Sequence, residues 1–523
     1  MIITVISGDI EQTLPFDSNQ DRNLLAALQA AGIYFPALCG GRGKCGKCRI
    51  QVTSGYLNPS SADRAYFTES DIKAGYRLAC TAYPAEDITI DIPVSGEQDF
   101  SAVDGFEPGY IGTGDTGNAG IHTVKPCAIA IDIGTTTIAL ALVDLVTGTI
   151  TGRLSVVNRQ REYGADVISR MQRANNGDLS LLSMCIRKQL AEGVSDICGN
   201  NNIDSNAVGS IAVAGNTTML HLLLGLSCST LGQYPFTPVT LDFVSRKYAE
   251  LFGEGPSCEV VILPGISTYV GADIVADIFF SELYTSTEPV LVMDIGTNGE
   301  MALSVSGDIL CTATAAGPAF EGGNILWGTG SVPGAISQVT YQNGTFAVKT
   351  IDNAPPIGIC GSGVVDTVWE GLKNGLILPN GRFGEQVGSA GLLLAKAPDG
   401  QDITVCQKDV RELQLAKSAV CSGIQALLHH TGLKPDDIKT LYIAGGFGYN
   451  LNFTSGAGIG LIPAALQSKV RLIGNGALGG AVKYLLKAES SETLNRIISI
   501  SKEYRLPEDD YFNEIFIENI NFG

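Results

Sequence analysis

The chain has 523 residues, more than one hydrophobic core normally supports, so we expect two to four domains. Hydrophobic residues make up 45% of it and charged residues only 17%, which is typical of a globular protein and not of a disordered one. The net charge of -19 argues against nucleic acid and anionic membranes as partners, because both are bound through basic clusters. The thirteen cysteines form no regular framework, which favours a reducing compartment with metal-bound or free thiols.

Two segments bear on where the protein works. The first residues, MIITVISGDIEQTL, have no basic region followed by a continuous apolar stretch, so we expect no secretory signal and a cytoplasmic location. Residues 205–241 contain no Asp, Glu, Lys or Arg, which raises the question of a membrane span. Asn216 and His221 interrupt this stretch and two prolines close it, so we interpret it as buried core and expect no membrane association.

Residues 1 to about 95 carry a pattern of metal ligands. The segments MIITVISG and the positions after Glu11 predict a hairpin, residues 21–31 a helix, and residues 88–94 a closing strand. Between them lie four cysteines, three of them in the glycine-rich and basic loop CGGRGKCGKC: Cys39, Cys45, Cys48 and Cys80. Glycines let the chain wrap closely around a cluster, and the basic residues moderate the negative charge of four thiolates on iron.

This cysteine spacing predicts a [2Fe–2S] cluster. Five residues separate Cys39 from Cys45, where the plant-type spacing has four, and the departure resembles the adrenodoxin-like spacing. A zinc site is the alternative because Cys45 and Cys48 form a CxxC pair, but no second close pair accompanies them. A disulfide framework is disfavoured in a chain without an export signal. Residues 96–125, rich in Gly, Asp and Thr and without lasting periodicity, predict a semi-flexible linker that lets the first domain move.

The rest of the chain contains an internal repeat. The stretch IAIDIGTTT at 129–137 returns as LVMDIGTNGE at 291–300, and each copy is an apolar strand that carries an aspartate and breaks into Gly-Thr. Glycine lets backbone N–H groups approach an anion, threonine hydroxyls add donors, and Asp132 or Asp294 could hold a hydrated divalent cation. A single copy is equally well explained as a buried hairpin with an Asp-capped turn. Two copies favour duplication, with two turns that grip a polyphosphate from both sides.

A second landmark also occurs twice. The segment SIAVAGNTTMLHLLLG predicts a strand that reaches Gly215, a turn and a helix, and TLYIAGGFGYN predicts a strand that ends at Gly445, followed by a helix. Each half opens with a predicted meander of strands and later gives one of these strand–turn–helix units. The segment CGSGVVD at 360–366 predicts a connecting helix.

The duplicated DIGT turns and the late GGFG resemble the acetate kinase, sugar kinase, heat-shock chaperone and actin superfamily. With the [2Fe–2S] pattern ahead of them, and with YGADVISR, DIGTNGEM and AAGPAFEGG, the chain is similar over almost its whole length to the reductive activators of corrinoid proteins. The resemblance implies an α+β N-terminal β-grasp ferredoxin domain at 1–95, a linker at 96–125, and an α/β duplicated ribonuclease H-like ATPase domain at 126–523. The two similar halves of the ATPase would span about 126–285 and 286–523.

The resemblance also implies roles for individual residues. In the first phosphate turn Asp132 would lie near Mg²⁺, and in the second Asp294 would do the same, so these two are the candidate catalytic residues for magnesium and water positioning. ATP would be bound by residues of the two turns and of the adenosine motif: Gly134, Thr135, Thr136, Gly296, Thr297, Asn298, Gly445, Gly446 and Phe447. The iron ligands would be Cys39, Cys45, Cys48 and Cys80.

The implied function is ATP-dependent reductive activation of a corrinoid methyl-carrier protein, in which one electron from the cluster returns cobalt(II) to cobalt(I). A low-potential electron donor is then a second partner, and a homodimer is expected because dimers are common in the superfamily. One alternative is a small-molecule kinase with a redox-sensing ferredoxin domain. Another is an electron-transfer module whose ATPase core is only a scaffold, against which the two intact phosphate turns argue.

Three further positions allow two interpretations each, and one pair of residues is assigned to the surface. Glu300 could position water or metal or be an exposed strand residue, and Asp273 could be a polar group of the cleft or an acid at a helix N-terminus. Cys360 could bridge a cluster across a dimer, but without a second nearby cysteine we interpret it as a small buried residue. Asp166 and Arg170, four residues apart on a predicted helix, are interpreted as a surface pair.

Overall fold

The structure is a computed structural model, and its described residues fall into two compact units. The first comprises Met1–Gln98, Asn158–Ile186 and His221–Pro235, and the second comprises Asp99–Val157, Arg187–Leu220 and Phe236–Gly523. The structure describes residues 1–7, 10–16, 23–31, 33, 43, 48–92, 106, 125–398, 400–449 and 451–522. Every structural statement below refers to these residues.

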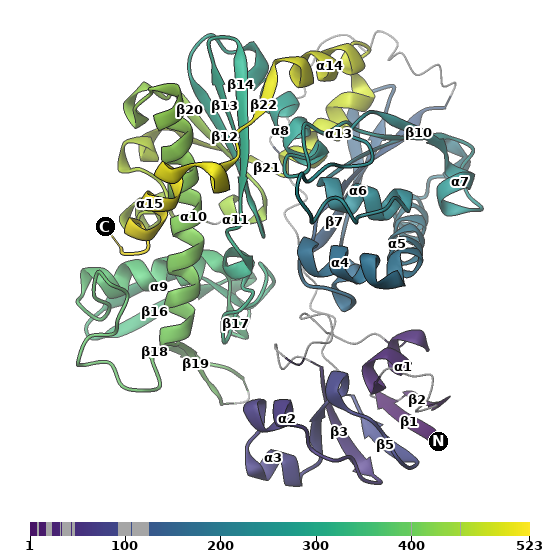
Figure 1. Ribbon diagram of the computed structural model, residues 1–523, viewed down its shortest axis with the longest axis vertical. Coiled ribbons are helices and arrows are strands. Elements are labelled where there is room, and N and C mark those ends of the chain that lie inside the picture. The colour runs from purple at the N-terminus through teal and green to yellow at the C-terminus, as the bar shows by residue number, and fades with distance from the viewer. Residues whose placement is uncertain are drawn as a thin grey trace. The chain divides into compact units, whose positions relative to one another are not determined.

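The first unit contains a five-stranded mixed sheet in the order β2-β1-β5-β3-β4 (Figure 1). Strands β1 and β2 form the expected antiparallel hairpin, and β5 pairs with β1 in parallel. Alternating buried positions along β5, such as Ile88 and Ile90, pack with Leu24 and Leu28 of α1 into one core. The elements are β1 (Ile2–Ser7), β2 (Ile10–Pro15), α1 (Leu24–Ala30), β3 (Arg49–Ser54), α2 (Ser61–Tyr66), α3 (Glu69–Lys73), β4 (Tyr76–Leu78) and β5 (Ile88–Asp91).

The second unit is built around two six-stranded sheets with the orders β10-β11-β9-β6-β7-β8 and β21-β20-β12-β13-β14-β22. The first sheet contains β6 (Cys127–Ile133), β7 (Thr137–Asp144), β8 (Thr149–Val157), β9 (Val208–Gly215), β10 (Val244–Lys247) and β11 (Glu259–Ile262). The second contains β12 (Val290–Ile295), β13 (Gly299–Val305), β14 (Asp308–Thr314), β20 (Thr440–Ala444), β21 (Val470–Gly474) and β22 (Ser501–Glu503).

The two sheets repeat the same topology over five strands each. In the first, β6, β7 and β8 form an antiparallel meander, and β9 and then β11 join β6 in parallel on its other side. In the second, β12, β13 and β14 form the meander, and β20 and β21 are added in parallel. The central parallel strand β9 is buried at every position, whereas the edge strand β8 alternates, as their places in the sheet require. The predicted duplicated ribonuclease H-like fold is therefore confirmed.

Equivalent helices of the two halves pack against each other. Helix α8 (Ala272–Ser281) follows β11, and α13 (Gly476–Leu486) follows β21 (Figure 1). The backbones come so close that a Cβ on Gly480 of α13 would lie 2.3 Å from the carbonyl oxygen of Ala276 in α8. Glycine at this position is what permits the close approach of the two halves.

The remaining helices are divided between the two units, with residues 158–186 belonging to the first. They are α4 (Val167–Arg173), α5 (Leu179–Asn200), α6 (Thr217–Leu224), α7 (Tyr248–Phe252), α9 (Gly361–Lys373), α10 (Gln407–Thr431), α11 (Gly446–Tyr449), α12 (Phe453–Gly458), α14 (Ser490–Ile500) and α15 (Asp510–Glu518). The short strands are β15 (Ala335–Gln342), β16 (Thr345–Thr350), β17 (Gly358–Ile359), β18 (Leu392–Lys396) and β19 (Asp402–Val405). The helix predicted from CGSGVVD is α9.

One surface prediction is wrong. Arg170 in α4 is fully buried, and its Nε donates to the carbonyl oxygen of Gly164 at 2.9 Å. Asp166 instead caps the N-terminus of α4 by accepting from the backbone N–H of Ser169 at 2.7 Å. The i, i+4 spacing indicated two neighbours on one helix face, but it carried no information on whether that face meets solvent.

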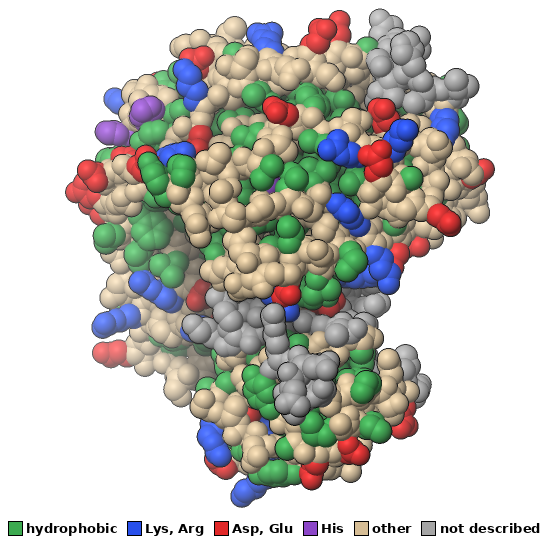
Figure 2. All heavy atoms as spheres, turned by 45° about the vertical axis from the view of Figure 1, so that its right-hand side comes forward, with side chains coloured by type: hydrophobic (Ala, Val, Ile, Leu, Met, Phe, Trp, Pro, Cys, Tyr) green, Lys and Arg blue, Asp and Glu red, His purple; other side chains and the backbone are tan. Residues whose placement is uncertain are grey.

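Within the described part of the chain, none of the helices combines the length and the apolar character needed to cross a bilayer. The uncharged stretch 205–241 contributes the buried strand β9 and the helix α6. On the face drawn in Figure 2, acidic and basic side chains are interspersed among neutral and hydrophobic ones and do not gather into one basic patch.

Phe106 is the one residue described between 92 and 125, and it contacts the second unit, to which it belongs. Its ring meets Phe280 of α8 edge to face, with 5.4 Å between the ring centroids, and the Arg153 guanidinium lies 5.2 Å from its centroid. Phe106 also forms an antiparallel bridge with Gly474, where β21 ends. Phe106 itself, which lies in the predicted linker region, is thus packed beside α8 and β21.

Candidate functional site

The first Gly-Thr turn joins β6 to β7. Asp132 lies at the end of β6, and its Oδ2 accepts a hydrogen bond from Nδ2 of Asn475 at 2.9 Å. A Cβ on Gly134 would lie 2.7 Å from the carbonyl oxygen of Thr137, so this tight turn requires glycine. Thr135 accepts from the side-chain amide of Asn216 at 3.2 Å. The turn is therefore held in place by residues from the ends of β9 and β21.

The second turn, between β12 and β13, is built in the same way. Asp294 is the penultimate residue of β12 and lies beside Gly445, and the N–H of Gly296 donates to the carbonyl oxygen of Asn298 at 2.9 Å. The hydroxyl of Thr297 donates to Oε2 of Glu321 at 2.8 Å. The sheet topology brings Gly445 to this turn because β20 runs parallel to β12 with Ala444 opposite Asp294.

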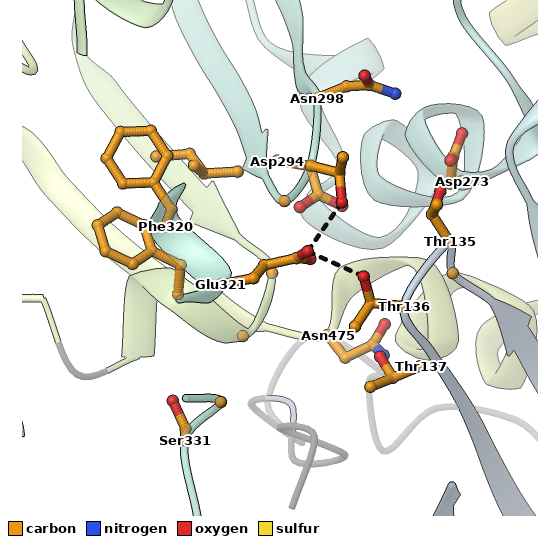
Figure 3. A pocket seen from close by; sticks show the side chains of 18 of the residues that line it. Thr135, Thr136, Thr137, Asp273, Asp294, Asn298, Phe320, Glu321, Ser331 and Asn475 are labelled. Carbon is orange, nitrogen blue, oxygen red and sulfur yellow. Dashed lines mark hydrogen bonds between the residues drawn. The ribbon is translucent and has the colours of Figure 1, made fainter. Parts of the chain in front are cut away.

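Both turns open into one cavity of about 180 Å³ (Figure 3). The structure brings together there every catalytic and nucleotide-binding residue predicted from the sequence: Asp132, Gly134, Thr135, Thr136, Asp294, Gly296, Thr297, Asn298, Gly445, Gly446 and Phe447. Glu300, Asp273 and Cys360, each of which allowed two interpretations, also line the cavity. Cys360 is 2% exposed and precedes the first residue of α9, as expected for a small buried residue.

Several lining residues were missed by sequence reasoning: Asn216, Phe320, Glu321, Thr329, Gly330, Ser331 and Asn475. Asn216 and Asn475 each follow a glycine at the end of an apolar strand, in VAGN and LIGN, so a search for this Gly-Asn pair could have found them. The rings of Phe320 and Phe447 are in contact, with centroids 4.5 Å apart, and form an apolar wall. Phe320 and Glu321 lie in AAGPAFEGG, one of the segments that carry the family resemblance, so that segment is the signal that could have found them.

The electrostatics of the cavity are dominated by carboxylates. Burial raises the pKa of Asp132 to about 7, against which the hydrogen bond from Asn475 acts, and burial with the charges of Asp273 and Asp132 raises the pKa of Asp294 to about 7. The pKa of Asp273 is raised to about 6 and that of Glu300 well above its usual range, in both mainly by burial. Among the described residues that line the cavity there is no lysine, arginine or histidine.

This donor set fits a polyphosphate that arrives with a divalent cation. Free polyphosphate would meet several buried carboxylates and no basic side chain, so it would be repelled. With Mg²⁺ bound, the carboxylates gain a counter-charge, and oxygen ligands are those that this ion prefers. The hydroxyls and backbone N–H groups of the two Gly-Thr turns can then donate to phosphate oxygens.

Two of the four predicted iron ligands lie in the described part of the first unit. The sulfur atoms of Cys48 and Cys80 are 3.2 Å apart, and the residues are 1% and 3% exposed. Cys48 directly precedes β3, and Cys80 lies in the 3₁₀ turn Ala79–Thr81. Cys39 and Cys45 lie outside the described residues. Two buried thiols side by side fit a cluster that needs four thiolates.

Comparison with known proteins agrees with this architecture. Three family models match the chain: a 2Fe-2S iron-sulfur cluster binding domain at residues 9–85, the RACo middle region at 127–286, and the C-terminal domain of RACo, the ASKHA domain, at 288–523. The chain is 30% identical to the corrinoid activation enzyme RamQ of Eubacterium limosum, over 97% of each chain. It is 28% identical to the [Co(II) methylated amine-specific corrinoid protein] reductase of Methanosarcina barkeri, over 58% of this chain and 59% of that protein.

A solved structure, titled reductive activator for corrinoid,iron-sulfur protein, matches 99% of this chain and 98% of its own with a TM-score of 0.70 and 27% identity. Fold and site together define a ferredoxin domain joined to an ATPase-type core of the ASKHA class. This chain belongs to the RACo family.

Proposed function

We propose that this protein is an ATP-dependent reductive activator that returns the cobalt(II) of a corrinoid methyl-carrier protein to cobalt(I). One observation carries the proposal: the same chain contains an iron–sulfur domain with paired buried cysteines and a cavity in which two Gly-Thr turns face buried aspartates. The names of its relatives, a corrinoid activation enzyme and a Co(II) corrinoid protein reductase, support the same reaction.

The energetics explain why the two activities are combined. A [2Fe–2S] cluster held by thiolates supplies one electron at about -400 mV. Cobalt(I) corrinoids are difficult to reach from there, and each roughly 59 mV of uphill one-electron transfer costs about 1.4 kcal/mol. ATP binding and hydrolysis would change how strongly the ATPase core holds the cobalt(II) partner. This is required because a nucleotide cycle shifts the equilibrium of electron transfer only if its nucleotide states bind the partner with different affinities.

In the nucleotide site we assign separate tasks to the residues. Asp132 and Asp294 hold Mg²⁺ and orient water, the turn residues Thr136 and Thr297 donate to phosphate oxygens, and the Gly445 loop borders the adenosine. The buried position of the two aspartates supports this assignment, because their pKa values near 7 leave them ready to lose a proton when a cation arrives.

The test uses the visible spectrum of a cobalt(II) corrinoid methyl-carrier protein mixed with the reduced protein, with and without Mg-ATP. We expect the cobalt(I) band only with ATP, and we expect Asp294→Ala and Cys45→Ser each to abolish it. Glu412→Gln, which removes a half-buried carboxylate outside the cavity that accepts from Asn324, is the matched control and should leave the band unchanged. No ATP-dependent band with any carrier, together with phosphate transferred to a metabolite, would favour the kinase alternative.

The remaining features of the proposal concern setting and assembly. We propose a cytoplasmic protein that receives electrons from a low-potential donor and forms a homodimer. Mass photometry at micromolar concentration tests the dimer, and detection of monomers alone would refute it. Reduction of the cluster by candidate donors, followed by its absorbance, identifies the donor class.

A further inference from the structure

Glu321 lies between the two Gly-Thr turns. It is the last residue of a short 3₁₀ helix, Pro318–Glu321, and its Oε2 accepts two hydrogen bonds. One comes from the hydroxyl of Thr136 in the first turn at 2.9 Å (Figure 3). The other comes from the hydroxyl of Thr297 in the second turn at 2.8 Å. A single carboxylate oxygen therefore ties together the two halves of the duplicated core.

The second oxygen of this carboxylate also lies against a turn. A Cβ added to Gly296 would be 3.4 Å from Oε1 of Glu321, so the carboxylate covers the glycine of the second turn. The residue before Glu321 is Phe320, and its ring contact with Phe447 of the Gly445 loop holds the 3₁₀ helix in place. An anionic group of the chain thus occupies the position between the turns, where hydroxyl donors and an open glycine backbone converge.

A polyphosphate needs these same donors. A threonine hydroxyl has one proton to donate, so Thr136 and Thr297 cannot serve both Glu321 and a phosphate oxygen. Two anions in one small cavity also repel each other, and Glu321 already acts on Asp294 by raising its pKa, after the larger effects of burial and of Asp273 and Asp132. Entry of phosphates between the turns must therefore displace this carboxylate.

We infer that Glu321 is an internal phosphate surrogate, which ties the two turns together in the nucleotide-free protein and must be displaced by the phosphates of the nucleotide. This inference rests on the proposed ATP-binding function of the same cavity. Glu321 is then a positioning residue that lowers nucleotide affinity. When phosphates displace it, the bridge between the two turns is lost, so nucleotide binding changes how the two halves are held together. Because this proposal gives the phosphates to the turns and the adenosine to the Gly445 loop, the coupling should grow with the number of phosphates.

The experiment compares the affinities of the full-length protein for Mg-ATP, Mg-ADP and AMP by isothermal titration calorimetry. Glu321→Gln removes the charge and keeps the shape, Glu321→Ala removes the bridge, and Glu412→Gln is the control for loss of one negative charge outside the cavity. We expect both Glu321 variants to bind Mg-ATP about tenfold more tightly, which corresponds to about 1.4 kcal/mol. The gain should be smaller for Mg-ADP and absent for AMP, and Glu412→Gln should match the wild type.

A second readout separates this role from a purely structural one. Without nucleotide, Glu321→Ala should unfold at a lower temperature because the bridge is lost, yet Mg-ATP should raise its unfolding temperature by more than that of the wild type. Unchanged or weaker Mg-ATP binding by Glu321→Gln would overturn the inference and point to a magnesium ligand or a catalytic group. A wild-type protein that binds no nucleotide in the same titration would overturn the proposed function and this inference with it.

Discussion

Gly445 offers a sharp test of the nucleotide site because its backbone and its neighbour both exclude a side chain. Its φ is +87°, and a Cβ there would lie 2.4 Å from Oδ1 of Asp294 and 2.9 Å from the carbonyl oxygen of Ile295. Gly432, which ends α10, provides the matched control. Its φ is +70°, but a Cβ there would meet no atom within 4 Å. An alanine at either site therefore meets the same backbone cost, but only at position 445 does its Cβ also clash with neighbouring atoms.

The magnitudes follow from this difference. A left-handed backbone costs an alanine about 1–2 kcal/mol, and this is the whole expected effect of Gly432→Ala. Gly445→Ala adds overpacking of about 1–3 kcal/mol, because ordinary contact with Oδ1 is restored only if the Asp294 carboxylate retreats by about 1 Å. A displacement of that size at a catalytic group costs roughly 100-fold in rate.

The assays are the urea midpoint of unfolding and the rate of Mg-ATP hydrolysis for both variants and the wild type. We expect Gly432→Ala to lose stability and keep its hydrolysis rate under native conditions. Gly445→Ala should lose more stability and about two orders of magnitude in rate. If Gly445→Ala hydrolyses ATP as fast as Gly432→Ala, then the placement of Asp294 against this loop has no part in the reaction, and our assignment of Asp294 is wrong.

Three further changes test other parts of the structure. Cys80→Ser should abolish the bound iron and sulfide found by chemical analysis, whereas Cys406→Ser, at the start of α10, should retain both. In magnesium-free buffer, burial raises the pKa of Asp132 in the folded state to about 7. Between about pH 4 and about pH 7 the folded state therefore binds more protons than the unfolded state, so Asp132 lowers the free energy of unfolding as the pH rises from about 4 to about 7. Asp132→Asn should therefore gain in urea midpoint over the wild type at pH 8 and gain little at pH 5, and an equal gain at both would contradict the reasoning. Asn475→Ala removes both the cap of α13 and the hydrogen bond to Asp132, so it should cost about 1 kcal/mol for the cap and weaken Mg-ATP binding in calorimetry.

Local sequence patterns predicted most residues of the site. The two DIGT segments predicted strand–turn–hairpin units because glycine and threonine next to an apolar run restrict what the backbone can do there. The structure has β6–β7 and β12–β13 at these places, and the second landmarks are the ends of β9 and β20. Repetition of a motif was the decisive signal, since it indicated two halves whose turns belong to one site.

The sequence did not show which residues far apart along the chain come into contact. Asn475 reaches Asp132 across 343 positions of the chain, and Glu321 reaches Thr136 across 185. Glu321 lies in no repeated motif, and Asn475 shares only the Gly-Asn pair with Asn216. Strand register and the packing of α8 on α13 bring Asn475 to the cavity, whereas Glu321 is placed by the packing of its 3₁₀ helix against α9 and α10. For the same reason the spacing of Asp166 and Arg170 predicted neighbours on a helix but not that the arginine is buried.

The sequence by itself determined the fold class, the duplicated phosphate turns and the cysteine pattern, because each depends on residues that are close along the chain. The tertiary structure decided which side chains share the cavity, which carboxylates are buried enough for raised pKa values, and that Glu321 bridges the two turns. These properties depend on distances between segments far apart in sequence, and such distances are set only when the sheets and helices of the two halves pack together.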